Sequence, residues 1–290
     1  MVLDIKGQLN NIRLSESKSL WPLFEAVVNA IQAIEESENK NNGRISIFAR
    51  RESDYGQQKL DQNASLERIE SFVVKDNGIG LNDTNYESFN TAYSTLKIQK
   101  GCKGIGRFLW LKAFNSVRVS SVYRSDESFL KREFSFTENG VDPLIDNVVR
   151  TNETNIGTEV MLEGFKMAYK NAAPVELDVI AKKIIEHCLP FFILGNCPEI
   201  ILFDDVSDSV NLNLYYEKNI KDTLHQDTFL IDEQEFILYH LRLPEGATTH
   251  EVHFCANMQE VESVDLKKYI PDLQKKIITD DAINVIKIRP

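Results

Sequence analysis

Residues 73–83 read VVKDNGIGLND, a stretch that runs from an aliphatic strand directly into an acid and two closely spaced glycines. The paired valines favour a strand, and Asp76 followed by Asn-Gly is a turn signal. Gly78 and Gly80 stand two residues apart, and glycines let a backbone approach a bulky neighbour closely. Taken alone, the stretch is typical of a strand that ends at a turn, but it also fits the wall of a ligand site.

Helix and strand patterns alternate on both sides of this stretch. Residues 18–38 carry apolar side chains at helical spacing and predict the clearest helix, with the NKNNGR segment as its stop. Residues 44–51 and 68–76 predict a hairpin with a long polar tip. Further helices are expected at 83–89, 107–114 and 174–189, and further strands at 116–124, 129–136 and 157–165.

The later part of the chain predicts a second unit. Strand-like stretches predominate there, namely EIILF, NLNLYY, EFILYHLRL and EVHFCA. We therefore expect one domain over residues 1–194 and a smaller α/β domain over residues 195–290. The chain stops soon after DLKKYIPDLQKKI, which leaves open that the second domain is incomplete and that the chain is a fragment of a longer protein.

Composition narrows the classes of function. The 290 residues are 42% hydrophobic, which is enough to build cores, and the net charge of -11 repels nucleic-acid phosphates and anionic lipids. No basic patch compensates, so direct nucleic-acid binding is not expected. The start of the chain lacks an apolar signal region, and no stretch is long enough to cross a bilayer. We expect a cytoplasmic protein without a disulfide framework or zinc site, because the four cysteines show no Cys-x-x-Cys spacing.

Two polar residues interrupt the apolar pattern of the first helix. Glu25 and Asn29 are four residues apart, so they lie on one face about one turn from each other. Burial of a carboxylate and an amide costs several kcal/mol unless both find partners, and a metal-bound ligand would be such a partner. Taken alone, the pair is more typical of the solvent side of an amphipathic helix.

A polar, glycine-bearing segment spans residues 90–106. Its Gly-x-x-Gly-x-Gly ending opens the helix expected at 107–114, and alone it is a weak signal that also fits a flexible surface loop. The order of the segments is more informative: a helix with Glu-x-x-x-Asn, a strand with Asp-x-Gly-x-Gly, a polar loop with a lysine, and then the glycine run.

These segments resemble the four nucleotide-binding boxes of the GHKL ATPases, which include type II topoisomerases, large heat-shock chaperones, MutL proteins, MORC proteins and histidine kinases. The stretches concerned are FEAVVNAIQA, KDNGIG, KGCKGIGRF and NIGTEV, in the same order over about residues 15–190. The resemblance implies an α+β fold, a two-layer sandwich of the Bergerat type with helices on one face of a mixed, mostly antiparallel sheet. It also implies that residues 195–290 are a transducer-like domain.

The resemblance further assigns roles to single residues. Glu25 falls on the general base that activates water, Asn29 on the Mg²⁺ ligand, and Asp76 on the acid that accepts the adenine amino group. The other residues expected to bind the nucleotide are Gly78, Gly80, Lys97, Gly101, Lys103, Gly104, Ile105, Gly106 and Thr158. Two positions depart from the family: Gln32 stands where relatives often carry an acid, and Arg107 directly after the glycine run is less usual.

The chain is therefore expected to bind and hydrolyse ATP with Mg²⁺, and to couple this to lid closure, conformational change or nucleotide-dependent homodimerisation. Its protein client is not indicated. One alternative is a protein kinase of the histidine-kinase type, although the first histidine, His187, follows all four boxes. Another is an ATP-binding switch with little turnover, against which Glu25 argues because a switch does not need the base.

Overall fold

The computed structural model describes residues 5–38, 40–52, 66–91, 106–143, 148–231, 234–242, 251–256, 259–265, 268 and 282–288. They divide into two compact units. The first unit gathers the described residues up to Lys183 together with Pro198–Asn211. The second gathers Ile184–Cys197 and the described residues from Leu212 onward. The expected boundary at residue 194 differs from this division, because the chain returns to the first unit after it.

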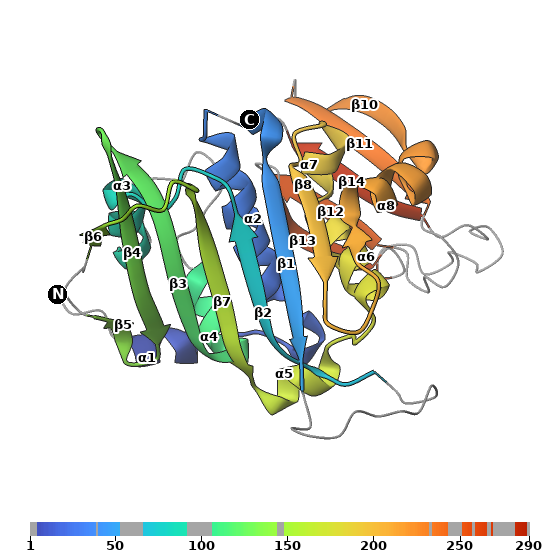
Figure 1. The fold of residues 1–290 in the computed structure, drawn as a ribbon. Helices are drawn as coiled ribbons and strands as arrows, with labels where there is room; N and C mark the ends of the chain where they lie inside the picture. The colour runs from blue at the N-terminus through green and yellow to red at the C-terminus, as the bar shows by residue number, and fades with distance from the viewer. Residues whose placement is uncertain are drawn as a thin grey trace. The chain divides into compact units, whose positions relative to one another are not determined.

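Nine strands build the sheet of the first unit, in the spatial order β5-β4-β3-β7-β2-β1-β8-β9, with β6 also on β4 (Figure 1). Most pairings are antiparallel; among the described strands of this sheet only β1 and β8 run parallel. The strands are β1 (Arg44–Arg51), β2 (Ile69–Asp76), β3 (Phe114–Ser125), β4 (Ser128–Thr137), β5 (Gly140–Asp142), β6 (Val148–Arg150), β7 (Gly157–Phe165), β8 (Glu199–Phe203) and β9 (Val210–Asn211).

Helices accompany this sheet, so the described residues form a mixed α+β arrangement. In Figure 1, α2 and α4 lie on the same face of the sheet, behind its strands. The helices up to the second unit are α1 (Ile5–Asn11), α2 (Trp21–Glu35), α3 (Asp83–Asn90), α4 (Gly106–Ala113), α5 (Met167–Ala172) and α6 (Leu177–His187), with short 3-10 turns η1 (Glu16–Lys18) and η2 (Lys40–Asn42). None of the described helices is long and apolar enough to cross a membrane.

The helix α2 is central because its apolar face is completely buried. Leu23, Val27 and Ile31, spaced by four residues, have no exposed surface, and the helix packs on β1, β2 and β7. A proline in its first turn suits the helix start, where the missing N–H has no helical partner. The helix ends at Glu35, before the NKNNGR segment that the sequence predicted as its stop.

The strands supply the opposite side of this core. The predicted hairpin is confirmed, since β1 pairs antiparallel with β2. Phe72 and Val74 of β2 face the core, and Phe72 meets the rings of Phe114 and Phe165, which stack on each other with centroids 4.4 Å apart. Apolar side chains at alternate positions thus fix which face of the sheet receives the helices.

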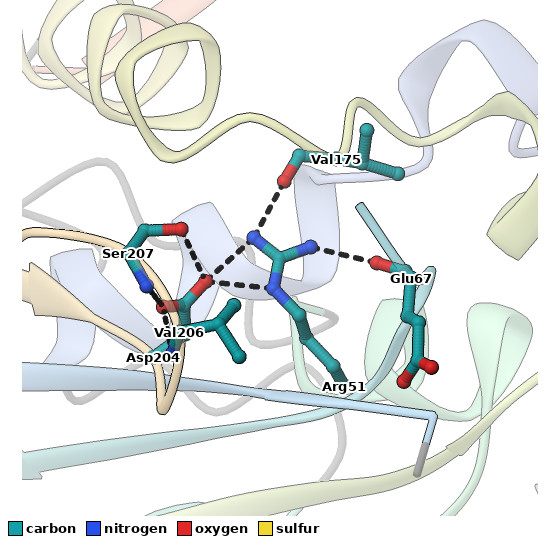
Figure 2. Close-up of polar contacts among 6 residues, drawn as sticks. All are labelled: Arg51, Glu67, Val175, Asp204, Val206 and Ser207. Atoms are coloured by element: carbon teal, nitrogen blue, oxygen red, sulfur yellow. Dashed lines mark hydrogen bonds and ion pairs between the residues drawn. The ribbon is translucent and has the colours of Figure 1, made fainter. Parts of the chain in front are cut away.

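The return of the chain to the first unit is held by a buried ion pair. Arg51, at the end of β1, donates from Nε to Asp204, which follows β8, over 2.7 Å, and both side chains are almost fully buried. Figure 2 shows the remaining contacts: the guanidinium also donates to the carbonyls of Glu67 and Val175, while Asp204 accepts the N–H groups of Val206 and Ser207. Every part of the pair is hydrogen-bonded, so the network joins four segments of the unit.

The second unit contains a separate sheet with the order β10-β11-β14-β12-β13. Its strands are β10 (His225–Ile231), β11 (Gln234–Arg242), β12 (Glu251–Ala256), β13 (Gln259–Asp265) and β14 (Ala282–Ile288), and its helical elements are α7 (Leu189–Ile193), α8 (Leu212–Asn219) and η4 (Lys221–Thr223).

The strand predicted at NLNLYY is wrong, because Leu212–Asn219 is the helix α8. The alternation of Asn and Leu has the period of a strand. However, Leu212 and Tyr216, four residues apart, are the side chains that are buried. Tyr216 lies against Phe192 with ring centroids 5.3 Å apart. Tertiary burial at helical spacing therefore overrides the local pattern.

Candidate functional site

Asp76 is the last residue of β2 and points into the protein interior. It is 7% exposed, and its Oδ1 accepts the N–H of Gly78 over 2.8 Å. Desolvation by burial raises the pKa of this carboxyl to about 7, while hydrogen bonds from the backbone of Gly78 and Thr158 act in the opposite direction. An acid held this way is preorganised to accept a hydrogen bond, and it titrates near neutral pH.

The two glycines that follow bring the loop against its neighbours. A Cβ on Gly78 would lie 2.8 Å from the Cβ of Ala33 on α2, and the N–H of Ile79 donates to the Ala33 carbonyl. Gly80 has φ +75°, and a Cβ there would lie 2.8 Å from the Cβ of Tyr123 on β3. Both glycines are thus required by close packing of the loop on α2 and β3, rather than by an open space beside them.

Ser121, on β3, joins this loop to the start of β7. The residue is 1% exposed. Its Oγ accepts the N–H of Leu81 over 2.7 Å, donates to the carbonyl of Gly157 over 3.0 Å, and lies 2.9 Å from the hydroxyl of Thr158. A single hydroxyl therefore connects the residues after Gly80 with Thr158, which in turn binds Asp76.

Arg132, on β4, fixes the next part of the same connection. Its guanidinium is almost completely buried, donates to the carbonyl of Leu81 and the carboxylate of Asp83, and lies over the rings of Tyr86 and Tyr123. The hydrogen bond from Arg132 is the largest cause of the lowered pKa of Asp83. The contacts anchor the first turn of α3 to the sheet.

Glu25 lies on α2 against the first residue of α4. A Cβ on Gly106 would lie 2.7 Å from the Cδ of the Glu25 carboxylate. Burial is the cause that raises the pKa of Glu25 to about 7. The residue is half-buried, and among the described residues its carboxylate makes no hydrogen bond. A partly desolvated acid therefore faces the start of a helix.

Asn29 is one helical turn further along α2 and is half-buried. Within the described part of the chain its amide makes no hydrogen bond, and no group of three or more His, Cys, Asp and Glu side chains is placed to hold a metal ion. An amide oxygen suits Mg²⁺ as one protein ligand when phosphates and waters supply the others. The residues present therefore fit a magnesium ion that arrives with a phosphate ligand.

Five of the sequence-predicted residues, Lys97, Gly101, Lys103, Gly104 and Ile105, lie outside the described residues. The two departures from the family pattern are both buried. Gln32 is 2% exposed on α2. Arg107 is 9% exposed, with its guanidinium 4.8 Å from the ring centre of Phe108 and 5.3 Å from that of Phe89. Burial lowers the pKa of Arg107 to about 10.

The structure brings the predicted residues into two groups. Asp76, Gly78, Gly80 and Thr158 surround the end of β2, and Glu25 meets Gly106 at the start of α4. The helix α2 connects the groups, since Gly78 packs on Ala33, which follows Glu25 by eight residues, or about 12 Å along the axis.

Ser121 and Arg132 were not predicted, although a signal for both exists in the sequence. Alternate residues of a strand face the same side of the sheet. On β3, Ser121 lies on the same face as the buried residues 117 and 119, and on β4, Arg132 lies on the same face as the buried residues 134 and 136. A polar side chain at a core-facing position of a strand needs a buried hydrogen-bond partner. Such a position in the alternating pattern therefore identifies a residue with a structural or functional role.

Comparison of the chain with known proteins found no matching family model and no matching curated protein. The assignment of a function therefore depends on the residues and their geometry.

Proposed function

We propose that this chain is a Mg²⁺-dependent ATPase of the GHKL type, with a Bergerat-type nucleotide-binding domain and a smaller transducer-like domain. The observation that carries the proposal is the position of two carboxylates whose pKa is raised by burial: Asp76, at the end of β2, beside the loop that packs on Ala33 of α2, and Glu25, on α2, against Gly106. The order of the four sequence boxes supports the same assignment.

The end of β2 suits the base of the nucleotide. An ionised Asp76 accepts a hydrogen bond from an amino group, which adenine carries and guanine lacks at the corresponding position. A hydrogen bond to a charged group contributes about 1.5 to 3 kcal/mol. The loop of Gly78 and Gly80 is already fixed by its packing on α2 and β3, so binding does not need to order it.

The other end of α2 suits the phosphates. The helix α4 begins at Gly106, and a helix start directs unpaired N–H groups and a positive dipole end at an anion. Asn29 would hold Mg²⁺ by its side-chain oxygen, and the ion, when bound, would neutralise charge on the phosphates. Glu25 would take the proton of the attacking water, and a pKa near 7 is suited to a general base at neutral pH.

Substitution of Glu25 tests the hydrolytic role. We expect Glu25→Gln to lower phosphate release by about 100-fold or more, because the amide cannot accept a proton. We expect ATP affinity by calorimetry to change little. Glu35→Gln, on the same helix but exposed, is the matched control and should behave as the wild type.

Two results would contradict the proposal at different levels. Phosphate release at the wild-type rate by Glu25→Gln would show that Glu25 is not the general base. Absence of ATP binding by the wild-type protein would show that the chain has no nucleotide site of the proposed kind. Phosphate release itself distinguishes the ATPase from a binding switch.

A further inference from the structure

The hydrogen bonds of Ser121 determine which way neighbouring protons point. A serine hydroxyl has one proton to donate and lone pairs that accept two hydrogen bonds. The Leu81 N–H can only donate, so it occupies one lone pair, and the Gly157 carbonyl can only accept, so it takes the proton. The remaining lone pair faces the Thr158 hydroxyl, 2.9 Å away. All three partners are satisfied when Thr158 donates its proton to Ser121.

This assignment fixes the chemical character of Thr158 as well. With its proton directed at Ser121, the Thr158 oxygen presents only lone pairs to its other side. The backbone N–H of the same residue is used by the Asp76 carboxylate. With Asp76 ionised, Asp76 and Thr158 therefore present acceptors, and no donor, at the end of β2.

We propose that Ser121 is a positioning residue that makes this site selective for a ligand edge bearing an amino group. The inference rests on the proposed function, in which the ligand is a purine nucleotide. Ser121 does not touch the ligand. It acts on the preference between ligands by holding the Thr158 proton away from the site.

The discriminating probe is a pair of nucleotides that differ along one edge of the base. ATP carries an amino group at the six position and an unprotonated nitrogen beside it, whereas inosine triphosphate carries a carbonyl oxygen at the six position and an N–H beside it. In wild type, two acceptors favour the amino group and repel the carbonyl. In Ser121→Ala, the Thr158 hydroxyl is free to rotate and donate to a carbonyl, so the two nucleotides become more alike for the site.

Calorimetric affinities for both nucleotides are to be measured for the wild type and for Ser121→Ala. We expect the preference for ATP over inosine triphosphate to fall about fivefold to tenfold in the variant, the effect of one hydrogen bond. Ser120→Ala is the matched control. It is adjacent on β3, and its Oγ donates to Glu133, 2.9 Å away, on the exposed face of the sheet. Its preference should equal that of the wild type.

A double-mutant cycle tests whether Ser121 acts through Thr158. Thr158→Val removes the hydroxyl with little change of shape, and we expect it to lower the preference for ATP. Ser121→Ala combined with Thr158→Val should then give the same preference as Thr158→Val alone, because the Thr158 hydroxyl through which Ser121 acts is already absent.

The alternatives give different results. Equal loss of affinity for both nucleotides in Ser121→Ala would mean a structural role only, and would overturn the inference. Additive effects in the double variant would also overturn it, because Ser121 would then act by a route other than Thr158. Either result, with ATP still bound by wild type, leaves the proposed function intact. If the wild-type protein bound neither nucleotide, both would fail.

Discussion

Single carboxylates decide the energetics of the candidate site. Glu25 is half-buried and Asp76 is 7% exposed, and burial raises the pKa of each to about 7. An acid whose pKa is higher in the folded protein binds more protons there than in the unfolded chain. Such a group lowers stability progressively as the pH rises from its unfolded pKa to its folded pKa, so the site costs stability at neutral pH in the absence of a ligand.

Removal of the Glu25 charge should therefore stabilise the protein in a pH-dependent manner. Between 4.5, the ordinary pKa of a glutamate side chain, and the folded value of about 7, the wild type progressively loses stability as the pH rises. We expect Glu25→Gln to raise the free energy of unfolding at pH 8 by up to about 3 kcal/mol, from 1.36 kcal/mol per pH unit. At pH 4.5 the gain should vanish.

Urea unfolding at both pH values checks this. Glu35→Gln, on the exposed side of α2, should show no such dependence. An equal gain for Glu25→Gln at the two pH values would mean that the carboxylate is not desolvated in the folded protein.

The Arg51–Asp204 pair offers a second residue-scale prediction, with a control on the same strands. Removal of one partner of a buried pair leaves an uncompensated charge, so Asp204→Ala should destabilise the first unit by about 3 to 5 kcal/mol. Arg44 and Glu199 also join β1 to β8, but they are exposed, so Glu199→Ala should cost less than about 1 kcal/mol. Equal losses of unfolding free energy would show that Arg51 finds other partners.

At the scale of elements, Arg132 connects β4 to the start of α3. The guanidinium holds Leu81 and Asp83, and the N-cap Asn82 between them accepts the N–H of Asn85 over 2.9 Å. Because α3 has eight residues and buries only Tyr86, these contacts are a large part of what holds it on the sheet.

We therefore expect Arg132→Met to speed amide hydrogen exchange in residues 81–90, with less effect in β7, because the loss is local. Lys131→Met is the control, since Lys131 belongs to ion pairs with Glu133 and Glu153 on the other face of β4. Unchanged exchange in residues 81–90 would mean that the cap and Tyr86 are sufficient to hold α3.

The sequence predicts helices and strands well where the apolar pattern is regular and where the buried residues follow from that pattern alone. Glu25, Asn29 and Asp76 were singled out because the order of the segments that carry them resembles the GHKL boxes; taken alone, their polarity also fits the solvent side of a helix or a turn at the end of a strand. Their roles stay predictions. The helix α8 was missed because burial of Leu212 and Tyr216 depends on a packing partner, Phe192, which the local pattern does not reveal. Ser121 and Arg132 were missed because their roles appear only when β3 and β4 are paired with the segments they bind.

At the scale of the whole molecule, the connection between the units limits where the chain can be divided. Residues 198–211 pair with β1 and supply Asp204, although the chain enters the second unit before and after them. The sequence placed a boundary at residue 194, since local composition does not show that β8 returns to the first sheet.

A fragment of residues 1–194 should therefore be less stable than a fragment of residues 1–211. The shorter fragment leaves Arg51 buried without its carboxylate and exposes the edge of β1, which invites association with other chains. Thermal unfolding and light scattering of the two fragments check this. Equal melting temperatures with no association of the shorter fragment would mean that β8 adds nothing to the first sheet.

The return of the chain through β8 brings a late segment of the chain close to the end of β2. Ile45 of β1 pairs with Ile200 of β8 on one side and with Asp76 of β2 on the other. The surroundings of this carboxylate are therefore complete only when residues 199–203 have taken their place in the sheet.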